Sequence, residues 1–304
     1  MVALSIVAGL MLLGIAFGVF EFDGLLDDLL SEGASDEEEA DTIEGSSGDD
    51  VLLADDGDDD IDADRGDDTI DAQGGEDRVL AGDGDDNIDG GDGNDTLLGE
   101  DGDDTILAGG GLDVVLGGDG QDEIDGGSGA DTILAQDGDD SVLARAGNDF
   151  VTGGEGNDTL KGGAGDDVLV GYEDAFLDQN FEDSDIYDPD EIVGGAGMDA
   201  IIAGSGDTIN GGDGVDALTL GSWIDPNNPV HIEGFEATED VIIVLVPDDY
   251  AGAGAITVDY YPGSGVHSGT LFLDGVRIAE VQGDGTFGFL DPSAVRVIAD
   301  ENFA

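Results

Sequence analysis

The sequence predicts an all-β fold, a solenoid in which short strands stack in successive coils and turns follow one another along its edges. Residues 45–170 repeat a nine-residue unit fourteen times without insertion or deletion. Every unit has glycine at its fourth place and aspartate at its sixth. The eighth place is always Leu, Ile or Val. Each unit therefore reads as a turn, a carboxylate and one apolar residue of a short strand.

The composition limits the class of protein. The 304 residues include 76 acidic and 6 basic side chains, a formal charge of -70, and 55 glycines. Without a repeat, such a chain is expected to be disordered. Its charge repels nucleic acid and anionic lipid and favours an abundant cation as partner. The absence of cysteine excludes disulfides and cysteine-based zinc sites.

The first 44 residues precede the repeats and fall into two parts. Residues 1–20 contain the uncharged apolar run 2–20, which as a helix would reach roughly 28 Å, just enough to cross a bilayer. We expect a membrane anchor, with a cleaved signal peptide second and a buried core helix third, because the run lacks a basic flank and exceeds a normal signal core. Residues 21–44 predict an acidic linker.

The strand within each unit is too short to be stable alone, so stacking must supply the rest. If two units form one coil, the chain returns to the same edge with every second unit. Fourteen units then give seven coils spaced by about 4.8 Å, roughly 30 Å in all. Aspartates two units apart, such as Asp86 and Asp104, would line one edge of the stack.

The turns present oxygen ligands. Glycine at the fourth place permits a tight turn that directs backbone carbonyls inward, and the sixth-place aspartate adds a hard anionic oxygen. Ca²⁺ takes six to eight such oxygens in a flexible shell, whereas Mg²⁺ requires a strict octahedron and transition metals favour imidazole or thiolate. The candidate metal ligands are Asp50, Asp59, Asp68, Asp77, Asp86, Asp95, Asp104, Asp113, Asp122, Asp131, Asp140, Asp149, Asp158, Asp167, Asp199, Asp207 and Asp216.

The stacking geometry also predicts how many ions bind and what they do. Seven turns on each of two edges leave six gaps per edge, hence about twelve Ca²⁺ ions. Without metal, stacked carboxylates about 5 Å apart repel one another, and fourteen aliphatic side chains form a thin core. Calcium binding and folding are therefore expected to be a single event.

The remainder of the chain departs from the strict period. Residues 171–193 predict an insert rich in aromatic and acidic side chains that projects from the solenoid. Repeats then resume at 194–202, lose one residue at 203–210 and end at 211–219, so the solenoid covers 45–219. Residues 220–304 contain β-branched runs separated by turn residues and predict a small antiparallel β cap domain, with a hairpin turn at Asp274-Gly275.

Three units, GGDGNDTLL (90–98), GGEGNDTLK (153–161) and GGAGDDVLV (162–170), resemble the nonapeptide repeats of the RTX (repeats-in-toxin) calcium-binding family. The resemblance covers residues 45–219. It implies a parallel β-roll, a right-handed solenoid with two strands per coil, in which turn carbonyls and the sixth-place aspartates hold Ca²⁺. It also implies an exported, extracellular or cell-surface protein that folds outside the cell.

The early units depart from the family pattern, because Ala replaces the first glycine and a larger residue the second, as in ADDGDDDID (54–62). We therefore expect these turns to bind more weakly. The family usually leaves the cell by a C-terminal signal, so the N-terminal apolar run makes the export route of this chain a separate question.

Two other functions compete with a non-catalytic calcium-binding module. An enzyme is disfavoured, because the chain has two histidines, no H-E-x-x-H and no G-x-S-x-G. The second alternative is an adhesin or matrix component, stiffened by calcium, that contacts a cell-surface or matrix partner through the insert at 171–193 or the C-terminal β domain. In the absence of calcium, the chain is expected to be a disordered polyanion.

Overall fold

The structure, a computed structural model, describes residues 40–171, 188–221, 224–236, 239–247, 256–260, 268–283 and 295–300. The chain divides into two units, Met1–Glu38 and Glu39–Ala304, and all described residues belong to the second. The expected apolar helix, nearly all of the expected linker and the aromatic residues of the expected insert lie outside this part. None of the described residues forms a helix long and apolar enough to span a membrane.

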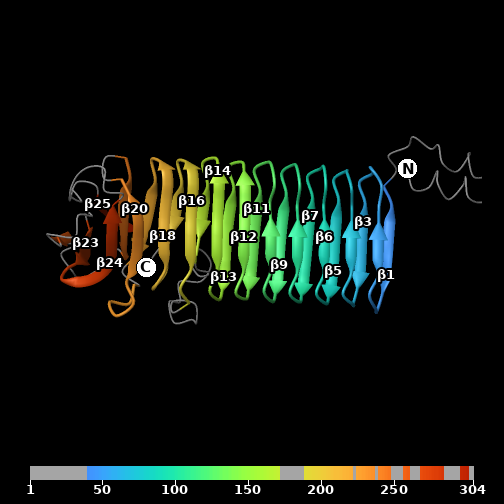
Figure 1. Ribbon diagram of the computed structural model, residues 1–304, viewed down its shortest axis with the longest axis horizontal. Helices are drawn as coiled ribbons and strands as arrows, with labels where there is room; N and C mark the ends of the chain where they lie inside the picture. The colour runs from blue at the N-terminus through green and yellow to red at the C-terminus, as the bar shows by residue number, and fades with distance from the viewer. Residues whose placement is uncertain are drawn as a thin grey trace, which may run out of the picture. The chain divides into compact units, whose positions relative to one another are not determined.

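The described residues form an all-β solenoid, as predicted, and contain no helix. The chain alternates between two sheets, so that the odd-numbered strands other than β23 join one sheet, and the even-numbered strands together with β23 join the other (Figure 1). Within residues 42–170, partners in each sheet are parallel and lie two units apart in the sequence, as Ile61 and Val79 do. The predicted coil of two units is therefore confirmed.

The first sheet has twelve strands, in sequence order in space. They are β1 (Thr42–Ser46), β3 (Asp60–Asp64), β5 (Arg78–Asp83), β7 (Thr96–Asp101), β9 (Val114–Asp119), β11 (Thr132–Asp137), β13 (Phe150–Glu155), β15 (Val168–Val170), β17 (Ala200–Ile202), β19 (Ala217–Gly221), β21 (Val241–Pro247) and β25 (Val295–Asp300).

The second sheet has thirteen strands, and only its last three break the sequence order in space. They are β2 (Val51–Leu53), β4 (Thr69–Asp71), β6 (Asn87–Asp89), β8 (Thr105–Leu107), β10 (Glu123–Asp125), β12 (Ser141–Ala146), β14 (Thr159–Ala164), β16 (Glu191–Gly197), β18 (Thr208–Gly214), β20 (Val230–Phe235), β24 (Val276–Gly283), β23 (Ser268–Leu273) and β22 (Ile256–Tyr260).

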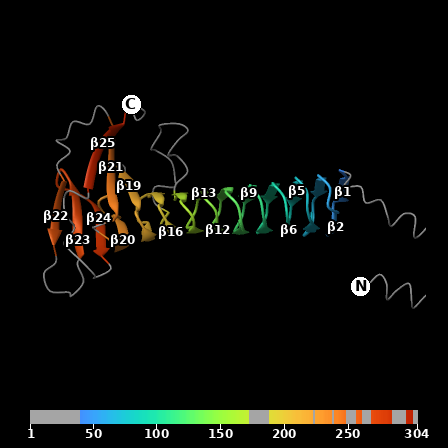
Figure 2. The same cartoon turned by 90° about the horizontal axis from the view of Figure 1, so that it is seen from above.

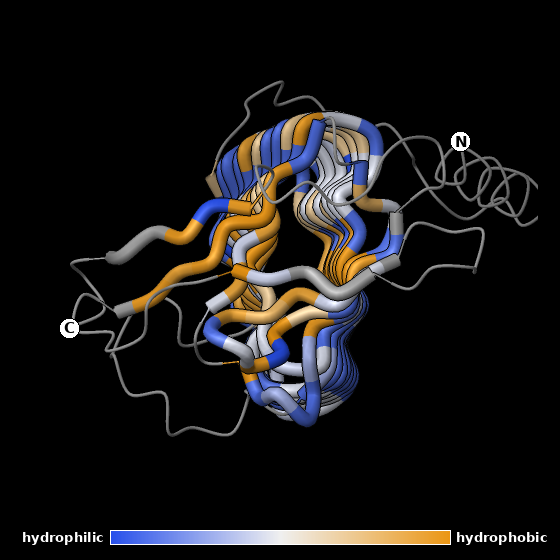
Figure 3. The backbone as a smooth tube through the Cα atoms, turned by 90° about the vertical axis from the view of Figure 1, so that its left-hand side faces the viewer, coloured by the Kyte–Doolittle hydropathy of each residue, from blue (hydrophilic) through white to orange (hydrophobic). Residues whose placement is uncertain are grey.

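The core is a narrow column between the sheets. The eighth-place aliphatic side chains from Ile61 to Leu169 point into it and are at most 1% exposed. Where the first place is Ala, as in Ala63 and Ala108, the methyl group is buried beside them. In the end view the coils superpose, and hydrophobic residues recur at the same points of successive coils (Figure 3). Apolar stacking thus fixes the register of both sheets.

Fourth-place glycines allow the turns of successive coils to touch. Gly129 has a φ of 136°, and a Cβ built on it would overlap the carbonyl oxygen of Gly111, one coil earlier. The same overlap with the glycine one coil earlier recurs at Gly138 and Gly165. Both the positive φ and the close approach exclude a side chain at these positions, which explains why this place stays glycine where a turn stacks closely on the one before it.

The insert is shorter than predicted at its C-terminal end. Glu191–Val193 were expected to belong to it, but they pair in β16 with Thr159–Lys161 of β14. In sequence, residues 185–193 read as a divergent unit with aspartate at the sixth place and isoleucine at the eighth, and this isoleucine, Ile192, is buried in the apolar column. The first strand, β1, begins at Thr42, three residues before the expected start of the repeats at Gly45.

The C-terminal region is not purely antiparallel, which corrects the expectation of an antiparallel cap. β21 and β25 extend the first sheet in parallel, and β24 pairs with β20 in parallel (Figure 2). Among the described strands, only the pairs β22–β23 and β23–β24 are antiparallel. The hairpin turn predicted at Asp274-Gly275 joins β23 to β24, and both residues have a positive φ. The apolar column therefore continues beyond the repeats.

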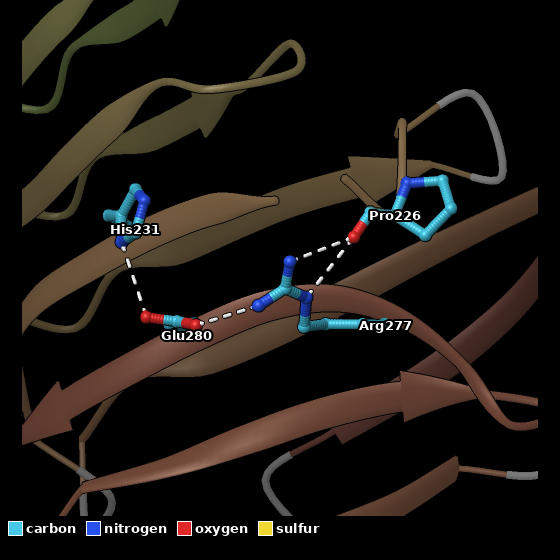
Figure 4. A network of polar contacts seen from close by, with 4 residues as sticks. All are labelled: Pro226, His231, Arg277 and Glu280. Carbon is cyan, nitrogen blue, oxygen red and sulfur yellow. Dashed lines mark hydrogen bonds and ion pairs between the residues drawn. The ribbon is translucent and has the colours of Figure 1, made fainter. Parts of the chain in front are cut away.

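A polar network ties this region to the loop before β20 (Figure 4). Arg277 donates from Nε and Nη2 to the carbonyl oxygen of Pro226, at 3.1 and 3.0 Å. Its Nη1 donates to Glu280 Oε1 at 3.0 Å, and Glu280 Oε2 lies 3.7 Å from His231 Nδ1. These side chains are partly exposed, so the network contributes modestly to stability and mainly fixes the loop.

Candidate metal centre

The sixth-place aspartates form two files, one along each edge of the solenoid, because each precedes a strand of one sheet. File 1 leads into the first sheet and contains Asp41, Asp59, Asp77, Asp95, Asp113, Asp131, Asp149, Asp167, Asp199, Asp216 and Asp240. File 2 leads into the second sheet and contains Asp50, Asp68, Asp86, Asp104, Asp122, Asp140, Asp158, Asp190 and Asp207.

One oxygen of each carboxylate builds the files. The backbone N–H of an aspartate donates to Oδ1 of the aspartate one coil later, as Asp86 does to Asp104 at 2.8 Å. This bond recurs along both files at 2.6 to 3.2 Å. It crosses the insert intact, since Asp158 donates to Asp190. Oδ1 is therefore a structural acceptor that links neighbouring coils.

The other oxygen, Oδ2, is buried and has no hydrogen-bond partner at fifteen of the file positions. They are Asp59, Asp68, Asp77, Asp86, Asp95, Asp104, Asp113, Asp122, Asp131, Asp140, Asp149, Asp158, Asp167, Asp199 and Asp216. These residues are no more than 2% exposed. A buried anionic oxygen without a donor or cation costs several kcal/mol. Their regular recurrence in two files points to one kind of partner, a cation.

Backbone carbonyls lie in the same space as these oxygens. A Cβ built on first-place Gly99 would meet both Asp104 Oδ2 and the carbonyl oxygen of Gly117. One coil later, a Cβ on Gly117 would meet Asp122 Oδ2 and the carbonyl oxygen of Ala135. The turn thus brings carboxylate and carbonyl oxygens from adjacent coils together. Hard oxygens alone suit Ca²⁺ better than a transition metal.

The electrostatics of the files agree with this need for positive charge. Burial raises the pKa of Asp104 and Asp140 to about 7, backbone hydrogen bonds oppose the rise, and neighbouring aspartates add to it. In file 1, the same causes raise the pKa of Asp77 and Asp113 to about 6. Each carboxylate is thus harder to ionise than in water, and a bound cation would offset that cost.

The structure divides the predicted ligands into two groups. Fifteen of the seventeen have an unpartnered Oδ2. The exceptions lie near file ends, where the backbone supplies a donor instead. Asp50 Oδ2 accepts from the N–H and the hydroxyl of Ser46, at 2.6 and 2.8 Å. Asp207 Oδ2 accepts from the Gly204 N–H at 2.6 Å. Oδ2 of both residues therefore has a hydrogen-bond donor within the protein.

Three file members were not among the predicted ligands. Asp190 is the sixth residue of the divergent unit 185–193, in which Asp188 replaces the turn glycine and hides the pattern. Asp41 lies one unit before Asp50 and is followed by Ile43 at the eighth place, a signal that the sequence did contain. Asp240 precedes β21 outside the repeats, and its Oδ2 accepts from the Glu236 N–H at 2.7 Å.

The residues present therefore fit a series of oxygen-bound cations, and comparison with known families agrees. The model of the RTX calcium-binding nonapeptide repeat matches in overlapping stretches that together span residues 37–175. The chain carries RTX calcium-binding nonapeptide repeats. The match begins ahead of Gly45, in accord with the place of Asp41 at the head of file 1. RTX repeats bind Ca²⁺, and the β-solenoid they build is a structural fold. No curated protein matches the chain.

Proposed function

We propose that this protein is a non-catalytic, calcium-loaded structural module whose RTX solenoid folds as it binds Ca²⁺. The fifteen buried carboxylate oxygens without a hydrogen-bond partner carry this proposal. Each would coordinate an ion together with turn carbonyls of adjacent coils. The ligands are then the aspartates of this set, from which Asp50 and Asp207 are absent, and Asp190 is added as a member of file 2. The number of ions is about twelve, because neighbouring turns share them.

Energetics support the coupling of binding and folding. Two unit charges about 4.8 Å apart repel by roughly 1 kcal/mol in water and by several times more when partly buried. Such pairs recur along both files, while the apolar column contributes one aliphatic side chain per unit. The metal-free chain lacks the attraction that would hold the coils together, and a cation in each gap converts repulsion into attraction.

Removal of calcium tests this function. In excess chelator at pH 7.5, the far-ultraviolet circular dichroism of the full chain should lose its β signal, and millimolar Ca²⁺ should restore it, with binding of about twelve ions measured by calorimetry. Mg²⁺ at the same concentration should restore little, because it keeps its waters. An unchanged spectrum in chelator would contradict the proposal.

A single file position should report the loss of one ion. Asp104→Asn removes charge from an unpartnered oxygen, and we expect it to lower the free energy of unfolding by roughly 3 kcal/mol when calcium exceeds its dissociation constant about 100-fold. Asp103→Asn is the matched control, since Asp103 is an exposed neighbour that accepts from Gln121 through Oδ1. Equal effects of the two substitutions in calcium denaturation curves would argue against a file ligand at Asp104.

The same coupling supports an extracellular or cell-surface site of action. Sites of this kind fill where calcium is millimolar and stay empty where it is submicromolar, so the chain would remain unfolded before export and fold after it. Fractionation of expressing cells, with the full chain followed in medium, membrane and cytosol, tests this location. Accumulation in the cytosol alone would contradict it.

A further inference from the structure

The N-terminal end of file 1 holds an acidic group unlike the rest of the array. One carboxylate oxygen from each of Asp41, Asp55 and Asp59 lies within 4.8 Å of the other two. Asp59 is 2% exposed, and its Oδ2 is buried and unpartnered. Asp41 and Asp55 are exposed. Three anionic groups thus converge at the boundary between the solenoid and solvent. One of them, Asp59, is buried and cannot be solvated by water.

Asp55 reaches this group because its unit turns differently. It occupies the second place, where the chain has a positive φ in most units, for example 115° at Gly82 and 75° at Asp64. Asp55 does not take up that conformation. Its Oδ1 instead accepts from the Gly57 N–H at 3.2 Å. A carboxylate therefore stands at the turn where the later coils GGDGNDTLL and GGAGDDVLV have glycine.

Asp41 is held in place by the backbone on both sides. Its N–H donates to Asp59 Oδ1 at 2.6 Å, and its carbonyl oxygen accepts from the Asp60 N–H at 2.9 Å. In every later coil of file 1, Oδ1 accepts from the aspartate one coil earlier. Within the described residues no coil precedes Asp41, so its carboxylate does not accept this hydrogen bond and is available as a ligand.

We propose that Asp41, Asp55 and Asp59 form an additional Ca²⁺ site that clasps β1 to the first full coil. Three carboxylates within 4.8 Å repel unless a cation lies among them, and hard oxygens with room for water suit Ca²⁺. The site shares Asp59 with the array and differs from the repeat sites because the Asp41 and Asp55 side chains replace turn carbonyls. This proposal rests on the proposed function only in that the array binds the same ion. Asp55 would thereby strengthen calcium binding at an early turn, which the sequence predicts to bind weakly.

The test compares charge removal inside and outside the group, in the full chain. Asp41→Asn/Asp55→Asn removes two of the three charges and keeps the backbone bonds. Asp56→Asn/Asp62→Asn removes the same charge from exposed residues of the same unit. Bound Ca²⁺ is counted by native mass spectrometry, and hydrogen exchange follows the peptide that covers residues 40–46. We expect the first variant to bind one ion fewer and to exchange about ten-fold faster there, while the control matches the wild type.

Two results would overturn the site: an unchanged ion count and exchange rate in Asp41→Asn/Asp55→Asn, or an equal loss in the control, which would reflect general charge. Because neither substitution touches the other members of the files, the rest of the array should still fold. A wild-type chain that binds no calcium at all would instead contradict the proposed function. A wild type that binds calcium normally, beside a variant that loses nothing, would remove this site alone.

Discussion

At the scale of the residue, each place of the repeat answers a separate physical demand. At the sixth place, Oδ1 accepts from a backbone N–H and Oδ2 is the proposed cation ligand, the eighth place fills the column, and the fourth lacks a side chain. The second place tolerates more, since Gln73 and Arg145 adopt a positive φ there. Such a conformation costs of order 1 kcal/mol, which the surrounding ladder offsets.

Gly129→Ala tests the demand at the fourth place. The new methyl group would overlap the Gly111 carbonyl oxygen in a backbone with a φ of 136°, so we expect a loss of about 2 to 4 kcal/mol in calcium-saturated unfolding. Gly48→Ala is the control, because a Cβ there meets nothing within 4 Å. If both variants unfold at the same denaturant concentration, contact between stacked turns does not restrict this place.

At the scale of the element, the length of a unit affects whether Oδ2 of its aspartate finds a hydrogen-bond donor. In the nine-residue units 99–107 and 117–125, Oδ2 faces the first-place residue of its own turn, as Asp104 Oδ2 faces Gly99. The eight-residue unit 203–210 lacks one turn residue, so the Gly204 N–H reaches Asp207 Oδ2. Asp207 is fully buried, and burial raises its pKa to about 7, yet both oxygens have donors. One deletion thus gives Oδ2 a hydrogen-bond donor.

Asp207→Asn should therefore destabilise the fold without changing the number of ions. The amide can keep only one acceptor oxygen, so a buried N–H of Gly204 or Asp190 loses its partner, at about 1 to 3 kcal/mol. Asp199→Asn, in the preceding full-length unit, should lower both stability and ion count. Calorimetric counting of Ca²⁺ on both variants checks the contrast. If Asp207→Asn also binds fewer ions, Asp207 is itself a ligand.

At the scale of the whole molecule, the two files make stability depend on charge neutralisation, by calcium or by protons. A formal charge of -70 with 6 basic side chains offers little internal compensation. The three basic residues with ion pairs in the array, Arg65, Arg78 and Arg145, contact exposed or partly exposed aspartates outside the files. The carboxylate files depend on an external cation, and in its absence on protonation.

The metal-free chain should gain structure on acidification. Burial raises the pKa of Asp104 and Asp140 to about 7 and of Asp86 and Asp149 to about 6, above the ordinary 3.8. Between the ordinary pKa of 3.8 and these raised values, the folded state therefore binds more protons than the unfolded state. The stability of the metal-free fold falls as pH rises through about 6 to 7. In chelator, the β signal should be larger at pH 5, above the sequence pI of 4.1, than at pH 7.5. No gain at pH 5 would contradict this.

The repeating part of the molecule follows from the order of its residues alone. A strict nine-residue period fixes which residues turn, which enter the column and which aspartates fall into line, because parallel coils must repeat every two units. Asp86 and Asp104 could therefore be placed on one edge in advance. The oxygen chemistry of the turns, and hence calcium, also followed from local residue types.

Contacts between coils settle what happens where the period fails. After the insert, Glu191 pairs with Thr159 and Asp190 joins file 2. Burial of Ile192 stabilises this arrangement, although the unit lacks the turn glycine by which the sequence pattern is recognised. Whether Oδ2 meets an N–H depends on the length of its own turn, so Asp104 and Asp207 both precede a strand and differ in their hydrogen bonds. Local sequence specifies a turn, but stacking supplies the N–H donor that Oδ1 of each buried carboxylate requires.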